Sequence, residues 1–190
     1  METVLLFHHA LGPTDGFLGF ADHLREAGHT VETPDLYEGK TFDNLDDGLA
    51  YVRQMGFDEF LRRGRQAAET MEPHLVYGGF SLGVLPAQSL AQTRPGAKGA
   101  LLYHACFPPE EFGGNWPRGL PAQIHMMRDD PFGEEDLPAA EALARAADDV
   151  ELFVYPGSGH LFADASAADY DAAAAGLLEE RTLTFLDRIG

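Results

Sequence analysis

Short apolar runs alternate along the chain with longer segments whose apolar residues recur at helical spacing. The first run, Thr3–His9, has the length of a buried strand. The next segment, Phe17–Ala27, places its apolar residues on one side of a helix and ends before Gly28. The same alternation continues to the last residues of the chain.

This pattern predicts six strands and at least five helical segments. The predicted strands are Thr3–His9, Thr30–Thr33, His74–Tyr77, Lys98–His104, Ala122–Met127 and Val150–Tyr155. The predicted helices are Phe17–Ala27, a segment from Asp46 to Glu69 with possible breaks at Gly48, Gly56 and Gly64, a segment that ends near Thr93, Leu137–Ala147 and Asp169–Ile189. Strands and helices that alternate in this way form a mostly parallel sheet with helices on both faces. No repeat or linker divides the chain, so we expect one α/β domain over residues 1–190.

Composition narrows the possible partners and compartment. The chain has 31 acidic and 13 basic residues, a net charge of -18, which argues against nucleic acid or an anionic membrane surface as a partner. Cys106 is the only cysteine, so an internal disulfide is impossible and a reducing compartment is expected. The first seven residues lack the basic and long apolar regions of a signal peptide, and no span is long enough for a membrane helix. We expect a cytoplasmic protein, a monomer or a homodimer.

The segment Gly79-Phe80-Ser81-Leu82-Gly83 fits Gly-x-Ser-x-Gly and lies between a predicted strand and a predicted helix. This is the context of a nucleophile elbow, in which a sharp turn exposes the serine at the end of a strand. A serine needs a base, and the base needs a third group to orient it. In enzymes with such an elbow the nucleophile, the acid and the histidine follow one another in that order along the chain. Ser81, the pair Asp129-Asp130 and His160 have this order.

Two choices within this site follow from position. Asp130 is favoured over Asp129 as the acid, because one more residue beyond the strand lets it reach the loop of His160; either aspartate could instead cap the turn at Pro131. The oxyanion hole needs two backbone donors, expected to be the amide of Leu82 and the amide of Ala10 or Leu11.

Aromatic side chains in loops at the same edge of the sheet could line a substrate pocket, or pack those loops onto the core. These residues are Tyr37, Phe107, Trp116, Phe132 and Phe162. The loop 107–121 could act as a small lid. His8 and His9 are adjacent, so on a strand they would point to opposite faces and make poor joint ligands; no metal is expected.

With these residues identified, the chain resembles the dienelactone hydrolase family over nearly its whole length. The resemblance rests on the turn Pro34–Tyr37, the elbow, the Asp130 turn, the segment Tyr155–Phe162 and the closing stretch Glu180–Leu186. It implies an α/β-hydrolase fold with Ser81 as nucleophile, Asp130 as acid, His160 as base and Ala10 as the second oxyanion donor.

The chain departs from that family at three positions. The best-known members have a cysteine where Ser81 stands, a glutamate where His9 stands, and an arginine that helps to bind the substrate carboxylate where Asp164 stands. His9 is therefore expected near the substrate. An acidic Asp164 would repel an anionic lactone, so dienelactone itself is a doubtful substrate.

Together these observations predict a serine hydrolase that cleaves a small ester or lactone without a cofactor. Two alternatives remain open at this point. The same triad could pass the acyl group to another acceptor, as in an acyltransferase or perhydrolase, or the chain could be a non-catalytic binding module on a hydrolase scaffold.

Overall fold

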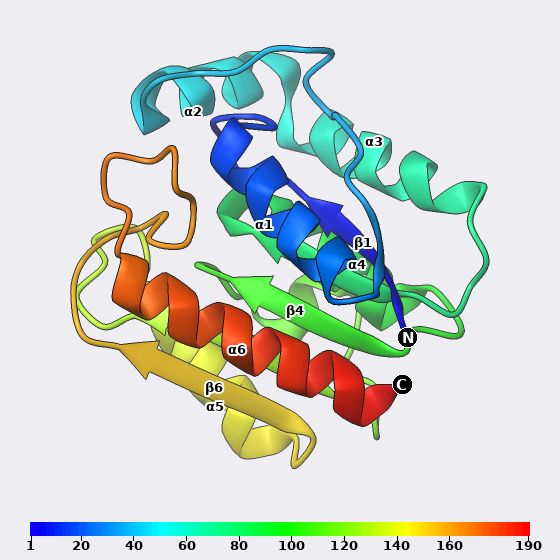
Figure 1. Ribbon diagram of the computed structural model, residues 1–190. Coiled ribbons are helices and arrows are strands. Elements are labelled where there is room, and N and C mark those ends of the chain that lie inside the picture. Colours follow the sequence, from blue (N-terminus) through cyan, green and yellow to red (C-terminus); the bar gives the residue numbers. More distant parts are fainter.

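A computed structural model describes all residues, 1–190, and contains one six-stranded sheet (Figure 1). The strands are β1 (Thr3–Phe7), β2 (Thr30–Glu32), β3 (Val76–Phe80), β4 (Gly99–Tyr103), β5 (Ala122–Met127) and β6 (Val150–Tyr155). Their spatial order is β2-β1-β3-β4-β5-β6, and every neighbouring pair is parallel. All six carboxyl ends therefore lie along one edge. The chain reverses its direction of travel across the sheet between β1 and β3, where such folds bind their ligands.

Helices cover both faces of the sheet. The helices are α1 (Asp15–Glu26), α2 (Leu45–Met55), α3 (Phe57–Glu69), α4 (Val84–Thr93), α5 (Asp136–Ala146) and α6 (Ala172–Ile189), with short 3-10 segments η1 (Ser81–Gly83) and η2 (Pro109–Phe112). Figure 1 shows α1 and α6 on one side of the sheet. They contribute Phe17, Leu24, Leu178 and Phe185 to the apolar core on that side.

A second apolar core fills the opposite face, beneath α2 to α5. Val52, Phe60, Ala87 and Leu143 each come from a different one of these helices and are buried. Burying one such Val, Leu or Phe side chain is worth about 1.5–3 kcal/mol. The α/β architecture predicted from the alternating pattern is confirmed.

The boundary between α2 and α3 differs from what the glycines suggested. The chain breaks only at Gly56, where φ is +96°. Gly48 and Gly64 instead lie inside helices, at positions where the helix packs closely against its neighbour. A Cβ on Gly48 would stand 2.2 Å from the carbonyl oxygen of Ala10, and one on Gly64 would stand 2.4 Å from Pro86 Cβ. Helix glycines at close contacts look the same in sequence as helix breakers.

Capping side chains fix the starts of three helices, α1, α2 and α6. The Thr14 hydroxyl accepts from the Phe17 amide at α1, the Asn44 side chain accepts from Asp47 at α2, and Asp171 accepts from Ala173 and Ala174 at α6. These bonds satisfy amides that have no partner inside the helix. The last helix therefore begins at Ala172, later than the predicted Asp169.

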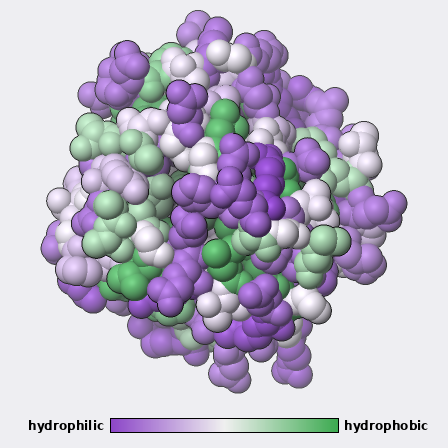
Figure 2. Space-filling view, in the orientation of Figure 1, coloured by the Kyte–Doolittle hydropathy of each residue, from purple (hydrophilic) through white to green (hydrophobic).

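Hydrophilic residues spread over the face seen in Figure 2, with smaller hydrophobic areas between them. None of the helices has an apolar stretch of the length needed to traverse a bilayer.

Candidate active site

Ser81 stands at the turn between β3 and α4, in a backbone conformation that few side chains adopt. Its φ is +50°, in the left-handed region. The two glycines of the motif make this turn possible: a Cβ on Gly79 would lie 2.2 Å from the Gly83 carbonyl oxygen, and a Cβ on Gly83 would lie 2.3 Å from that of Phe7. Larger residues at either position would open the turn, so the sequence Gly-x-Ser-x-Gly produces the expected elbow.

Three side chains from three strand ends form one hydrogen-bonded chain. Ser81 Oγ lies 2.6 Å from His160 Nε2, and His160 Nδ1 lies 2.6 Å from Asp130 Oδ2. Because a carboxylate only accepts, Nδ1 carries the proton and Nε2 is left to accept from the serine hydroxyl. His160 and Asp130 are both buried, so little water competes for these bonds.

The neighbouring aspartates differ in their surroundings. Asp130 is buried, and its Oδ1 accepts from the amide of Phe132 at 2.9 Å. Asp129 is exposed, while its amide donates to the carbonyl of Gly157 and extends the pairing of β5 with β6. The structure therefore brings Asp130 to His160 and leaves Asp129 facing solvent.

Two backbone amides near Ser81 are available to bind an oxyanion. Leu82 is in the first turn of the helical segment that begins at Ser81, where amides lack an intrahelical partner. Ala10, in the loop after β1, donates to no carbonyl of the chain. Both residues line the same pocket as Ser81.

This pocket has a volume of about 170 Å³ and is mostly apolar. Its hydrophobic lining residues are Ala10, Leu45, Leu49, Leu82, Ala105, Phe107 and Phe132. Its polar lining residues are Ser81, His160 and Asp136. Of the two roles open for the loop aromatics, Phe107 and Phe132 take the position of pocket lining.

Sequence reasoning missed Leu45, Leu49 and Asp136. The two leucines are four residues apart on α2, so their shared face was visible in the sequence, but nothing local shows that α2 packs across the end of β3. Asp136 carries no motif and becomes noticeable only once α5 is placed beside Ser81.

Four other side chains expected at the substrate lie elsewhere. Tyr37 is buried beneath α2 and α3, with its ring against His8, Tyr51 and Phe60. Phe162 turns into the core, where it packs against His104 and Tyr155. Both rings are fully buried, because the loops that carry them fold inward to close the core.

Trp116 and His9 are the other two corrections. The Trp116 indole donates to the Leu120 carbonyl and lines a separate groove of about 600 Å³ beside α5. His9 is fully buried; its Nε2 donates to Asp164 Oδ2 at 2.5 Å and its Nδ1 accepts from the Leu11 amide. Both ring nitrogens of His9 are therefore engaged away from the pocket.

Asp164 is likewise buried rather than exposed to substrate. Burial by itself would raise its pKa, but hydrogen bonds from His9, the Thr14 hydroxyl and the Ser166 amide together hold that pKa below its usual range. These bonds connect the loop after β1, which carries Ala10, to the segment that follows His160. The expected repulsion between Asp164 and an anionic substrate is thus wrong in its premise, since the carboxylate faces His9.

Burial keeps two further histidines, His8 and His104, and the thiol of Cys106 in their neutral forms. Burial lowers the pKa of His8 to about 4 and that of His104 well below its usual value, and it raises the pKa of the Cys106 thiol to about 12. His8 donates to the His9 carbonyl and accepts from the Leu36 amide, so its two nitrogens are occupied. No three His, Cys, Asp or Glu side chains converge as a metal site would require.

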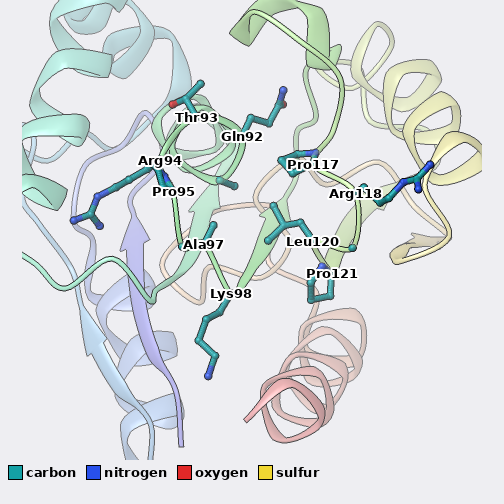
Figure 3. Close-up of a pocket in the computed structure, with 13 residues that line it drawn as sticks. Gln92, Thr93, Arg94, Pro95, Ala97, Lys98, Pro117, Arg118, Leu120 and Pro121 are labelled. Atoms are coloured by element: carbon teal, nitrogen blue, oxygen red, sulfur yellow. The ribbon is translucent and has the colours of Figure 1, made fainter.

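A third hollow, of about 410 Å³, lies at the opposite edge of the sheet. It is lined by residues 91–98 and 117–121, which precede β4 and β5 (Figure 3). Its cationic side chains, Arg94, Lys98 and Arg118, point away from one another in that view. Arg94 bonds the Met71 carbonyl and the Tyr77 hydroxyl, and Lys98 pairs with Glu2, so these two charges serve the fold.

The comparisons with known proteins agree with this geometry. The model of the dienelactone hydrolase family matches residues 1–190. No protein of curated function has a sequence that matches.

Solved structures of α/β hydrolases share the fold at low sequence identity. A dienelactone hydrolase-like promiscuous phosphotriesterase from metagenomic libraries is 20% identical with a TM-score of 0.79, over 100% of this chain and 87% of that one. A cold-adapted esterase from an Arctic intertidal metagenomic library is 17% identical with a TM-score of 0.71, over 98% and 82% of the two chains. The dienelactone hydrolase of Anabaena variabilis is 14% identical with a TM-score of 0.69, over 99% and 86%.

The sheet order, the elbow and the family match over the full sequence support one conclusion. The chain belongs to the dienelactone hydrolase family and is a hydrolase of the α/β fold.

Proposed function

We propose that this protein is a serine hydrolase that cleaves a small carboxylic ester or lactone through an acyl-enzyme. The observation that carries the proposal is the bonded series Ser81–His160–Asp130, with both distances at 2.6 Å, opening on a small apolar pocket. A serine hydroxyl is a weak nucleophile, and a histidine that already accepts its proton makes it a reactive one.

In the first half-reaction His160 Nε2 takes the proton from Ser81 Oγ while the oxygen attacks the ester carbonyl. The negative charge that forms on the carbonyl oxygen is stabilised by the amides of Leu82 and Ala10. His160 then gives the proton to the departing alkoxide, and the bond between carbonyl carbon and alcohol oxygen breaks. Asp130 keeps the imidazole in the required tautomer and stabilises its positive charge.

In the second half-reaction a water molecule replaces the alcohol. His160 removes a proton from this water, whose oxygen attacks the acyl carbon, and the proton passes to Ser81 Oγ as the acid leaves. The small volume and the seven hydrophobic lining residues favour a substrate with a short acyl or alcohol chain.

The test combines labelling with turnover. A fluorophosphonate should form a covalent adduct on Ser81, found by peptide mass spectrometry, and p-nitrophenyl acetate should give a burst equal to the concentration of active sites. Ser81→Ala should abolish both, while Ser158→Ala, which removes an exposed hydroxyl near His160 in sequence, should leave both intact. Absence of an adduct and of a burst in the wild-type protein would favour a non-catalytic binding module.

The acyl acceptor is tested with the same substrate. Hydrolysis should be unaffected by added alcohol or hydrogen peroxide at concentrations far below that of water. Products in which the acyl group is transferred to these acceptors in preference to water would instead indicate an acyltransferase or a perhydrolase.

A further inference from the structure

Asp136 is the single carboxylate among the residues that line the Ser81 pocket. It is the first residue of α5 and is partly buried. Seven of the ten lining residues are hydrophobic, and the remaining polar ones, Ser81 and His160, are used in the proposed chemistry. Asp136 is therefore the one charged group of the pocket without a role in that chemistry.

No basic side chain neutralises this carboxylate. The pocket contains no lysine or arginine, and Asp136 forms no ion pair with any part of the chain. A carboxylate that is partly removed from water without a cation is costly, and an incoming positive group would offset that cost.

The groups that face Asp136 determine its charge. Burial raises its pKa to about 6, while His160 and the amide of Cys106 oppose that rise and the carboxylates of Asp130 and Glu135 add to it. With a pKa of about 6, most of the Asp136 population is ionised at pH 7.5. The pocket then presents a negative charge close to the reacting serine.

We propose that the Ser81 pocket selects small esters that carry an ammonium group, with Asp136 as the counter-ion for that group. The proposal rests on the serine hydrolase function proposed above and names its substrate class. Esters with a carboxylate are disfavoured, because their charge would approach Asp136 in a mostly apolar, low-dielectric pocket. This is the opposite of the anion recognition expected where a pocket offers arginine.

The pocket volume limits how large such a substrate can be. The pocket's volume of about 170 Å³ is below the range of about 300–1,000 Å³ that is usual for ligand pockets. An acyl group of three or four carbons with a terminal ammonium fits this space, whereas a peptide or a long acyl chain would have to extend outside it.

The experiment compares three methyl esters at pH 7.5 in a pH-stat. Methyl 3-aminopropanoate is cationic, methyl butanoate is its neutral isostere, and monomethyl succinate is anionic. Each kcat/KM is divided by the hydroxide-catalysed rate constant of the same ester, which removes the effect of the ammonium group on intrinsic reactivity. The normalised values should fall in the order cationic, neutral, anionic.

Asp136→Asn should lower the ratio of cationic to neutral turnover about tenfold, the effect of about 1.4 kcal/mol of lost ion pairing. Glu135→Gln is the matched control. It removes the same charge from the adjacent residue, which is exposed and lines the groove beside α5 rather than the Ser81 pocket. Its ratio should equal that of the wild type.

The outcomes separate this proposal from the one on which it rests. Equal normalised rates for the three esters, or an unchanged ratio in Asp136→Asn, would overturn the ammonium selectivity and leave the Ser81 chemistry standing; Asp136 would then only stabilise the first turn of α5. A wild-type protein that hydrolyses none of the three and takes no fluorophosphonate would overturn both. If Asp136→Asn does not fold, the order of the three wild-type rates decides the question.

Discussion

At the scale of single residues, the pair Asp129-Asp130 shows how one step along the chain changes what a side chain can do. Both lie just beyond β5, with Asp129 in the turn at residues 128–129 and Asp130 one residue past it. Asp129 faces water, and Asp130 points inward to His160 Nδ1. Because the contact between Asp130 and His160 is buried, little water competes for it.

The first prediction concerns this pair. Asp130→Asn should lower kcat for p-nitrophenyl acetate by about a thousandfold or more, because the amide donates where the carboxylate accepted and holds His160 in the wrong tautomer. Asp129→Asn should change kcat less than about twofold, since its side chain touches neither His160 nor the pocket. Steady-state kinetics on both variants make the comparison, with circular dichroism to show that each is folded. A larger loss in Asp129→Asn would overturn the assignment of Asp130 as the acid.

The sequence predicts side-chain positions best where a backbone rule fixes them. The glycines around Ser81 dictate the elbow, and chain order with strand ends brought Asp130 and His160 to it. Pocket aromatics were less predictable, because a loop can turn a ring inward or outward with the same sequence. Phe107 lies in the pocket and Phe162 in the core, although both follow strand ends. That choice depends on how neighbouring loops pack.

At the scale of elements, α2 connects the outer layer of helices to the edge of the sheet where Ser81 lies. Leu45 and Leu49 line the Ser81 pocket, and between them Gly48 lies against the carbonyl of Ala10. The position of α2 therefore affects both the wall of the pocket and the loop of Ala10, the proposed second oxyanion donor. From sequence, Gly48 looked like a possible helix break; the structure shows a contact between helix and loop that no local pattern encodes.

The second prediction tests this contact with two glycines in helices. In α6, Gly176 has open space where a Cβ would be, so Gly176→Ala should raise the free energy of unfolding by about 0.5–1 kcal/mol through helix propensity alone. Gly48→Ala gains the same propensity, but its Cβ would lie 2.2 Å from a backbone oxygen, and the resulting overpacking costs about 1–3 kcal/mol.

Urea unfolding of the two variants gives the comparison. Gly48→Ala should be less stable than the wild type and also slower on p-nitrophenyl acetate, since the strain acts on the Ala10 loop. Gly176→Ala should be more stable at unchanged activity. If Gly48→Ala were stabilised to the same extent as Gly176→Ala, α2 would not be in close contact with this loop.

At the scale of the whole molecule, the fold was the most predictable part. Strands that are covered on both faces are apolar throughout, so they stand out in the sequence as short apolar runs. The alternation of six such runs with helical segments therefore predicts a parallel sheet of six strands. The net charge of -18 can be counted from the sequence, but the kind of ligand that such a protein binds cannot be derived from it. Acidity argues against nucleic acid as a partner, and the proposed preference for an ammonium ester rests on the location of Asp136 in the pocket.

The last prediction separates the charge of the whole molecule from that of Asp136. Raising NaCl from 0.01 M to 1 M shortens the Debye length from about 30 Å to about 3 Å, so the field of distant carboxylates is lost while a direct contact persists. For methyl 3-aminopropanoate, kcat/KM should therefore fall several-fold with salt, in the wild type and in Asp136→Asn alike. For methyl butanoate it should stay constant, which controls for salt effects on the serine chemistry. At 1 M NaCl the wild type should still prefer the cationic ester and the variant should not. If that preference in the wild type vanished completely at high salt, the general negative field would account for it and Asp136 would have no specific part.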